Sequence, residues 1–175
     1  GRQRTRRHRE HGRGPEPPRR RDAGQLRLTP RALPRVAPTV SRFTLGDVND
    51  TADATAALTQ ALGRFGVDID LLPQLLCLAQ GSVSAEISSG TAVETLQDAV
   101  DIHIADSLAV LETGWLAAAG GLIDIGSGLG FPGLALASAR PELNVVLLDA
   151  ARKKITASAL MARRCELNNV EAMWG

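Results

Sequence analysis

The feature that most constrains the fold is a change in hydrophobic pattern at residue 121. From there on, short apolar runs alternate with segments of helical period, and Gly and Pro separate them, which is typical of strands that alternate with helices. We expect strands at 122–125, 144–148 and 170–173, and helices at 132–140 and 150–166. Because a strand–helix–strand unit makes a right-handed crossover, this order predicts an α/β fold with a Rossmann-like parallel sheet of two to three strands.

Upstream of that point the pattern is helical. Apolar residues recur at helical spacing between 50 and 62 and predict an amphipathic helix. A second helix is expected to begin at an Asp70 N-cap and to end at Gly81. A third is expected to begin at the T-x-x-E capping box of residues 91–94 and to run to about residue 112, where Gly114 ends it.

The net charge of +1 conceals two different kinds of polypeptide. Residues 1–35 hold twelve arginines against three acidic residues, a charge of +9, whereas residues 36–175 carry −8. An Arg- and Pro-rich composition buries too little apolar surface to offset the entropy of ordering, so we expect a disordered arm over 1–40. Its role stays open: an RNA-binding arm, a transit-like leader, or upstream sequence without a role. The remainder divides into a helical region, 41–113, and an incomplete Rossmann-like domain, 114–175.

Several protein classes are excluded by composition. No apolar run reaches the roughly 18 residues of a membrane span. The two cysteines, Cys77 and Cys165, lie far apart in the sequence with no metal-ligand pattern around them, so we expect neither a disulfide nor a metal site. This cysteine usage suits a reducing compartment, and we expect the protein to be cytoplasmic.

The chemistry is concentrated in the glycine-rich turn after the first strand, residues 124–133, which read D-I-G-S-G-L-G-F-P-G. Glycines let the backbone take positive φ and let a ligand lie against the main chain, so the turn predicts a nucleoside-type cofactor; the alternative is an ordinary glycine-rich turn. Asp124 would repel a pyrophosphate but attract the cationic methyl donor S-adenosylmethionine, rather than a dinucleotide. Asp149 is placed to accept hydrogen bonds from ribose hydroxyls or, alternatively, to cap the following helix.

These residues also carry a family resemblance. The turn, the L-L-D of 147–149, the R-K-K of 152–154, the H-x-x-D-S-L of 103–108 and the L-N-N-V of 167–170 resemble the bacterial 16S ribosomal RNA guanine-N7 methyltransferase family, also called glucose-inhibited division protein B. The resemblance covers about residues 95–175. It implies a class I methyltransferase fold, the cofactor S-adenosylmethionine, and 16S rRNA or the small ribosomal subunit as partner. The residues expected at the cofactor are Asp124, Gly126, Ser127, Gly128, Gly130, Phe131, Pro132 and Asp149.

Guanine N7 carries a lone pair and no proton, so its methylation needs alignment and exclusion of water but no general base. His103 and Asp106 are three residues apart and are candidates for the base pocket, or else form a surface pair. Arg152, Lys153 and Lys154 are expected to hold RNA phosphates, or to be a solvated first helical turn.

Because the first methionine is Met161 and the family continues beyond Gly175, we expect the sequence to be a piece of a longer protein. An inactive fragment or RNA-binding remnant therefore stays open as a second function. A nicotinamide-dependent oxidoreductase stays open as a third, because a G-x-G-x-x-G turn also fits a dinucleotide. An open apolar strand edge in such a piece predicts aggregation or weak cofactor binding, which an extended chain would not show. The oligomeric state is not indicated by the sequence.

Overall fold

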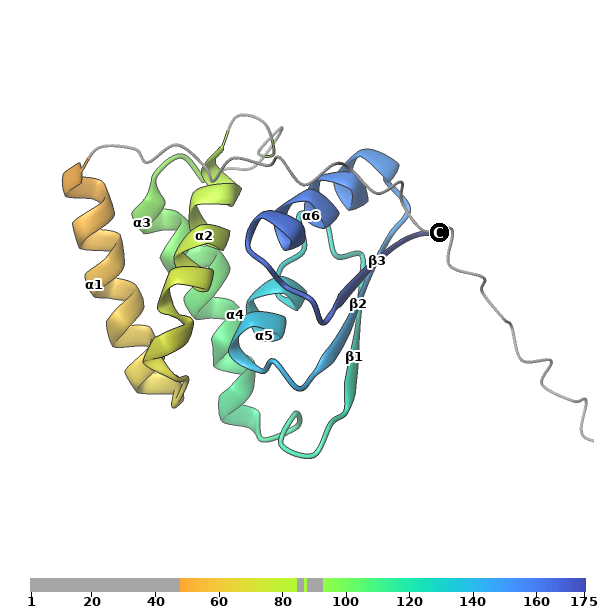
Figure 1. Ribbon diagram of the computed structural model, residues 1–175, viewed down its shortest axis with the longest axis horizontal. Helices are drawn as coiled ribbons and strands as arrows, with labels where there is room; N and C mark the ends of the chain where they lie inside the picture. Colours follow the sequence, from red (N-terminus) through yellow and green to blue (C-terminus); the bar gives the residue numbers. More distant parts are fainter. Residues whose placement is uncertain (1–47, 85–86, 88–92) are drawn as a thin grey trace, which may run out of the picture.

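The computed structural model describes residues 48–84, 87 and 93–175, and the predicted arm over 1–40 lies outside them. Figure 1 shows the described part in three layers. A sheet forms one side, two helices, α5 and α6, cover one of its faces, and the remaining helices, α1 to α4, lie beyond them.

The sheet has three parallel strands, as predicted. They are β1 (Gly121–Ile125), β2 (Asn144–Asp149) and β3 (Val170–Trp174), hydrogen-bonded in the order β1-β2-β3. In the register, Ile125 pairs with Leu148, and Leu148 pairs with Met173. Residues in one such row share a face, so Ile125 lies on one side of the sheet and Leu147 on the other.

The two crossover helices lie between the strands in sequence. They are α5 (Gly133–Ala139) and α6 (Arg152–Arg164). Every residue of α5 is buried, because the helix lies between the sheet and the outer helices. This position explains a helix composed only of Gly, Ala, Leu and Ser, since a helix enclosed on all sides has no polar face.

The outer layer begins with α1 (Val48–Phe65), and the predicted stripe is confirmed: Ala54 and Leu58 are fully buried. A short 3₁₀ turn, η1 (Ile69–Leu71), then leads into α2 (Leu72–Val83). The prediction of Asp70 as N-cap is wrong. Asp68 caps the turn by accepting from the backbone N–H of Asp70 at 3.0 Å, and α2 continues through the predicted stop at residue 81.

The last outer helix is continuous but changes type along its length. It consists of α3 (Leu96–Asp98), the π-helix η2 (Ala99–Ala105), α4 (Asp106–Leu108) and the 3₁₀ segment η3 (Ala109–Thr113). Thr95 caps its start by accepting from the Asp98 backbone N–H at 3.0 Å. The predicted capping box at Thr91 falls outside the described residues. Gly114 ends the helix in the left-handed conformation, φ 72°, as predicted.

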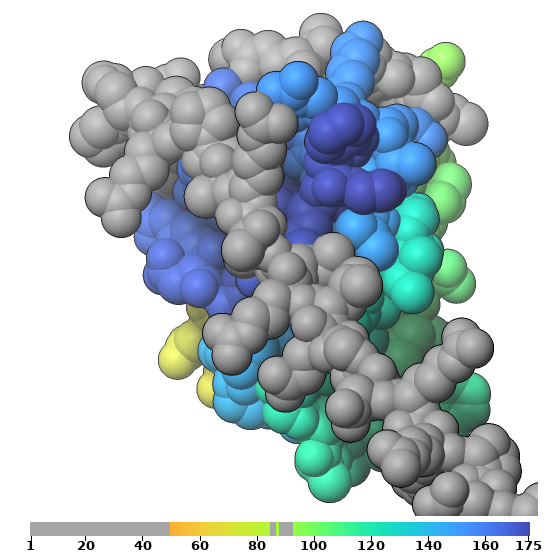
Figure 2. Space-filling view, turned by 90° about the vertical axis from the view of Figure 1, so that its right-hand side faces the viewer, coloured from red at the N-terminus to blue at the C-terminus, as the bar shows by residue number. Residues whose placement is uncertain are grey.

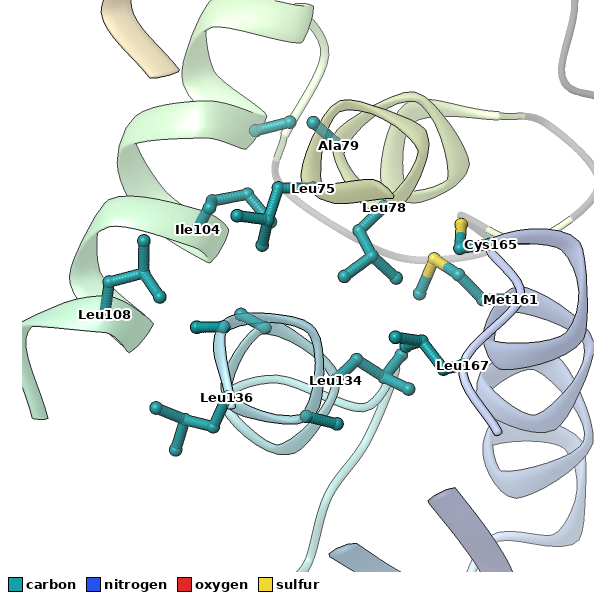
Figure 3. Close-up of a cluster of buried hydrophobic side chains, with 14 of the residues drawn as sticks. Leu75, Leu78, Ala79, Ile104, Leu108, Leu134, Leu136, Met161, Cys165 and Leu167 are labelled. Carbon is teal, nitrogen blue, oxygen red and sulfur yellow. The ribbon is translucent and has the colours of Figure 1, made fainter. Parts of the chain in front are cut away.

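One hydrophobic core joins all three layers. Figure 3 shows side chains converging from four helical segments: Leu78 from α2, Leu108 from α4, Leu134 from α5 and Met161 from α6. Leu147 of β2, with no exposed surface, belongs to the same cluster. The outer helices are therefore packed onto the sheet unit through a shared core.

Helices α5 and α6 cover one face of the sheet, whereas no described helix covers the other face. Ile123 is 63% exposed and Ile125 78% exposed. In Figure 2, dark blue atoms of β3 and turquoise atoms of the β1 region reach the molecular surface. Among the described residues, no helix is long and apolar enough to cross a membrane.

The two cysteines contradict the expectation drawn from their spacing. Cys77 of α2 and Cys165, which follows α6, have Cα atoms 5.6 Å apart and are joined in a disulfide. They are 88 residues apart in sequence, and only the packing of α2 against the end of α6 brings them together. Cysteine usage consequently no longer argues for a reducing compartment.

Candidate functional site

The glycine-rich turn closes over the carboxyl end of the sheet. The backbone N–H groups of Gly126 and Ser127 both donate to the carbonyl of Leu148, at 2.7 and 3.1 Å. Gly126 has φ 76° and Gly130 φ 103°, conformations that a side chain disfavours. At Gly130 the reason is also spatial, because an added Cβ would lie 2.4 Å from Leu134 Cδ1.

Asp149 holds this turn from the end of β2. Its Oδ2 accepts from the Gly128 N–H at 2.8 Å and its Oδ1 from the Ala151 N–H at 2.7 Å. Both backbone hydrogen bonds stabilise the carboxylate and so lower the pKa of Asp149. The bond from the Ala151 N–H has the larger effect. The carboxylate therefore ties the glycine turn to Ala151, the residue before α6. Ala151 itself is the N-cap of α6 and no side chain caps this helix, so the alternative that Asp149 caps it is not observed.

Asp124 performs a similar task for α5. Its Oδ2 accepts from the Gly133 N–H at 3.0 Å. Gly133 must lack a side chain, since a Cβ there would lie 2.4 Å from Leu147 Cδ2 and 2.9 Å from that same carboxylate oxygen. Burial raises the pKa of Asp124, and the charge of Asp149 acts in the same direction, while the hydrogen bond from Gly133 opposes them.

A cavity of about 1050 Å³ opens beside the turn. Three elements form its walls: the glycine turn, the first half of α6, and the outer layer through His103 and Ile87. The lining residues predicted from the sequence are His103, Gly126, Ser127, Gly128, Phe131, Arg152, Lys153 and Lys154. The predicted residues that do not line it are Asp106, Asp124, Gly130, Pro132 and Asp149.

His103 and Phe131 meet across the boundary between the outer helices and the turn. Their rings stack with centroids 4.7 Å apart and an interplanar angle of 10°. Burial lowers the pKa of His103, which favours the neutral ring at neutral pH. Asp106 is exposed instead, because the π-helix turns more slowly than an α-helix and residues three apart no longer share a face.

Two polar atoms at the cavity are buried without a hydrogen-bond partner, Ser127 Oγ and His103 Nε2. The Ser127 side chain is only 3% exposed. A buried polar atom without a partner costs free energy, and native proteins keep few of them. Their position at one cavity indicates that this region is arranged to meet a polar ligand.

Sequence reasoning missed six lining residues, Ile87, Leu129, Ala151, Thr156, Ala157 and Leu160. The last three continue the face of α6 that begins with the basic residues, at spacings of three and four, so helical periodicity was a signal that could have found them. Ile87 had no such signal. It lies in the Ser-rich stretch 82–90, which is typical of a loop and does not mark a buried residue, yet Ile87 is only 1% exposed.

Comparison with known sequences bears on this arrangement. A sequence model of the family described as rRNA small subunit methyltransferase G (GidB) matches residues 85–174, just over half of the chain. The chain belongs to this family. The match includes the glycine turn, both carboxylates, all of α6 and every described residue that lines the cavity.

Individual members named ribosomal RNA small subunit methyltransferase G agree with the family assignment. The protein of Methylobacillus flagellatus is 35% identical over 67% of this chain and 58% of its own length. That of Legionella pneumophila strain Philadelphia 1 is 34% identical over 70% of this chain and 57% of its own length. That of Lachnoclostridium phytofermentans is 36% identical over 49% of this chain and 35% of its own length. The matches thus cover between about a third and three fifths of these rRNA small subunit methyltransferase G proteins.

Proposed function

We propose that this chain is part of an S-adenosylmethionine-dependent methyltransferase that methylates guanine N7 in 16S ribosomal RNA, in the cytoplasm. The observation that carries the proposal is that the family match falls on the segment that builds the cavity. The names of the relatives supply the substrate class, and the resemblance of the D-I-G-S-G-L-G-F-P-G turn supplies the cofactor and the N7 position.

The residues at the cavity fit such a cofactor. Small-molecule pockets span about 300–1,000 Å³, so about 1050 Å³ leaves room for a nucleoside cofactor with part of a base beside it. Gly126 and Gly128 would let it approach the main chain, and the unpaired Ser127 hydroxyl would hydrogen-bond to it. When bound, the cofactor supplies a methyl group on a sulfonium. Asp124 and Asp149 would act on it through the turn that they hold.

The chain's own contribution to methylation is positioning. Guanine N7 has no proton to remove, so no side chain has to act as a base. The stacked rings of His103 and Phe131 form a flat wall that would orient a flat base and keep water away. A neutral His103 also adds no positive charge beside a sulfonium or beside the cationic product.

Recognition of RNA is assigned to the start of α6. Arg152, Lys153 and Lys154 line the cavity at the helix N-terminus, where side-chain charge and helix dipole are both positive. Positive charge placed there destabilises the helix itself, so its presence favours a role in binding phosphate. RNA phosphates would be held at the rim while a base enters the cavity.

The test is transfer of labelled methyl groups from S-adenosylmethionine to small-subunit RNA, with the modified position mapped by strand cleavage at N7-methylguanosine. We expect labelled N7-methylguanosine with the wild-type chain, formed slowly because this piece is expected to bind the cofactor weakly, and much less of it with Gly126→Ala. Gly63→Ala is the matched control, because Gly63 has open space around it and lies on α1, remote from the cavity in sequence and without positive φ.

Binding measurements with RNA, S-adenosylmethionine and a nicotinamide dinucleotide, made beside this assay, separate the remaining alternatives. RNA binding without any methyl transfer would support the remnant interpretation. Tight binding of a nicotinamide dinucleotide, with no binding of S-adenosylmethionine, would support the oxidoreductase and contradict the proposal.

A further inference from the structure

A second chemical feature lies outside the cavity beside the glycine turn. The disulfide between Cys77 and Cys165 connects the middle of α2 with the residue that follows α6. Figure 3 places Cys165 next to Leu78 and Met161, where the outer helices meet the sheet unit. The cross-link therefore joins two layers that otherwise adhere through side-chain packing and hydrogen bonds.

One of the two elements that it joins, α6, is a wall of the cavity, whereas no residue of α2 lines it. The first half of α6 lines the cavity, and its other end carries the cross-link. Helix α2 belongs to the outer layer, which reaches the cavity through His103 and Ile87. Because a helix is stiff along its axis, fixing one end of α6 to α2 restrains the position of the α6 wall relative to the outer layer.

Gln74 reinforces the same junction by hydrogen bonds. Its Nε2 donates to the Cys165 carbonyl at 2.9 Å, and its Oε1 accepts from Ser138 Oγ on α5 at 2.8 Å. These bonds do not depend on the redox state of sulfur. After reduction the Ser138 bond still holds α2 to α5. The end of α6 keeps its packing and the hydrogen bond from Gln74 but loses the covalent link, so reduction should loosen α6 without releasing α2 from α5.

The disulfide can be reached by a small reagent. Both cysteines line a second cavity of about 480 Å³, on whose walls Asp70, Arg164 and Glu166 also lie. Cys165 is only 3% exposed, whereas Cys77 is half-buried and is the more exposed residue of the two. Thiol–disulfide exchange requires this kind of access for an attacking thiolate.

We propose that Cys77 and Cys165 form a reversible thiol–disulfide switch that controls the mobility of α6 at the cavity. A dithiol reductant attacks Cys77 Sγ, and Cys165 leaves as a thiolate that takes up a proton. The second thiol of the reagent then releases Cys77, so the reagent becomes a cyclic disulfide and the protein gains two thiols. A consequence for methyl transfer rests on the proposed function; the effect on α6 does not.

The test is hydrogen exchange of the whole chain, oxidised and after reduction with dithiothreitol, with thiols counted by alkylation and mass spectrometry. We expect two alkylated thiols on reduction only, and at least tenfold faster exchange at residues 151–160. Amides of α1, which the cross-link does not touch, should be unchanged and serve as the reference for global unfolding. Reoxidation should restore slow exchange.

The double variant Cys77→Ser, Cys165→Ser is the matched control and should exchange like the reduced chain whether or not reductant is present. The proposal is overturned if the oxidised chain already has two free thiols, if exchange at 151–160 is equal in both states, or if α1 accelerates equally. Absence of S-adenosylmethionine binding in both states would count against the proposed function alone, since the exchange data judge the switch by themselves.

Discussion

The pKa values of the two carboxylates that hold the glycine turn, Asp124 and Asp149, are shifted in opposite directions. Asp149 is partly exposed and accepts two backbone hydrogen bonds that lower its pKa below the ordinary value of 3.8. Asp124 is partly buried, and desolvation raises its pKa above 3.8. Charging Asp149 therefore favours the folded chain, whereas charging Asp124 disfavours it.

This contrast predicts opposite pH dependences for two matched variants. Asp149→Asn should be less stable than the wild type at pH 7, and the difference should disappear as the pH falls from 3.8 through the lowered pKa of the folded chain. Asp124→Asn should gain stability relative to the wild type as the pH rises from 3.8 through the raised pKa. Urea unfolding between pH 3 and 7 measures both, and parallel pH profiles of the two variants would refute this assignment.

Gly130 combines an unfavourable φ with a lack of space. Gly130→Ala should lower the free energy of unfolding by about 2–4 kcal/mol, because the positive φ and the collision with Leu134 both destabilise the folded chain. Gly126→Ala has the same sign of φ but open space around it, so about 1 kcal/mol is expected. Urea denaturation compares them, and equal losses would show that the collision is relieved by rotation of Leu134.

At the scale of helices and strands, the sequence predicted what depends on local pattern. The three strands, α5, α6 and the stop at Gly114 follow from hydrophobic period and from glycine, and the structure contains them. The choice of Asp68 over Asp70 as a cap depends on where the 3₁₀ turn begins, and both are acidic. The π-helix that separates His103 from Asp106 has no sequence pattern of its own.

The candidate site was predictable to a similar degree. The glycine turn and the basic turn of α6 are contiguous in sequence, so their roles could be proposed from local motifs. The stacking of His103 on Phe131, the position of Ile87 at the cavity and the pairing of the cysteines depend on packing between distant segments. A single sequence does not contain that information in readable form.

The basic residues at the start of α6 support a prediction about both RNA binding and thermal stability. Changing Arg152, Lys153 and Lys154 together to Gln should weaken RNA binding and reduce the slope of log affinity against log salt, by about 0.7–0.9 for each phosphate that the variant no longer neutralises. The same change should slightly raise thermal stability, since these cations oppose the helix dipole. Filter binding at several salt concentrations and a melting curve test both effects.

Arg163→Gln is the control for this experiment, because it removes one positive charge at the opposite end of the same helix. It should leave the salt slope nearly unchanged. An identical loss of slope per charge at both ends would indicate general attraction to RNA and contradict a specific role of the α6 N-terminus.

At the scale of the whole molecule, the two faces of the sheet differ in how far their apolar side chains are exposed. Changing Ile123 and Ile125 to Thr should reduce concentration-dependent aggregation, measured by light scattering, with a stability change within about 1 kcal/mol, because both side chains are exposed. Leu147→Thr in the neighbouring strand should cost at least about 3 kcal/mol, because Leu147 is completely buried. Undiminished scattering of the double variant would exclude this face as the source of association.

The hydrogen bonds of Asp124 and Asp149 with the main chain have a consequence for how such a protein can diversify. The side chains that shape the turn and those that face the cavity are largely separate sets. Substitutions at the cavity wall can therefore accumulate without breaking the hydrogen bonds that hold the glycine turn. The ligand preference can then change while the fold of the turn is kept. A library randomised at Leu129, Thr156 and Leu160 alone would explore new selectivities on an intact framework.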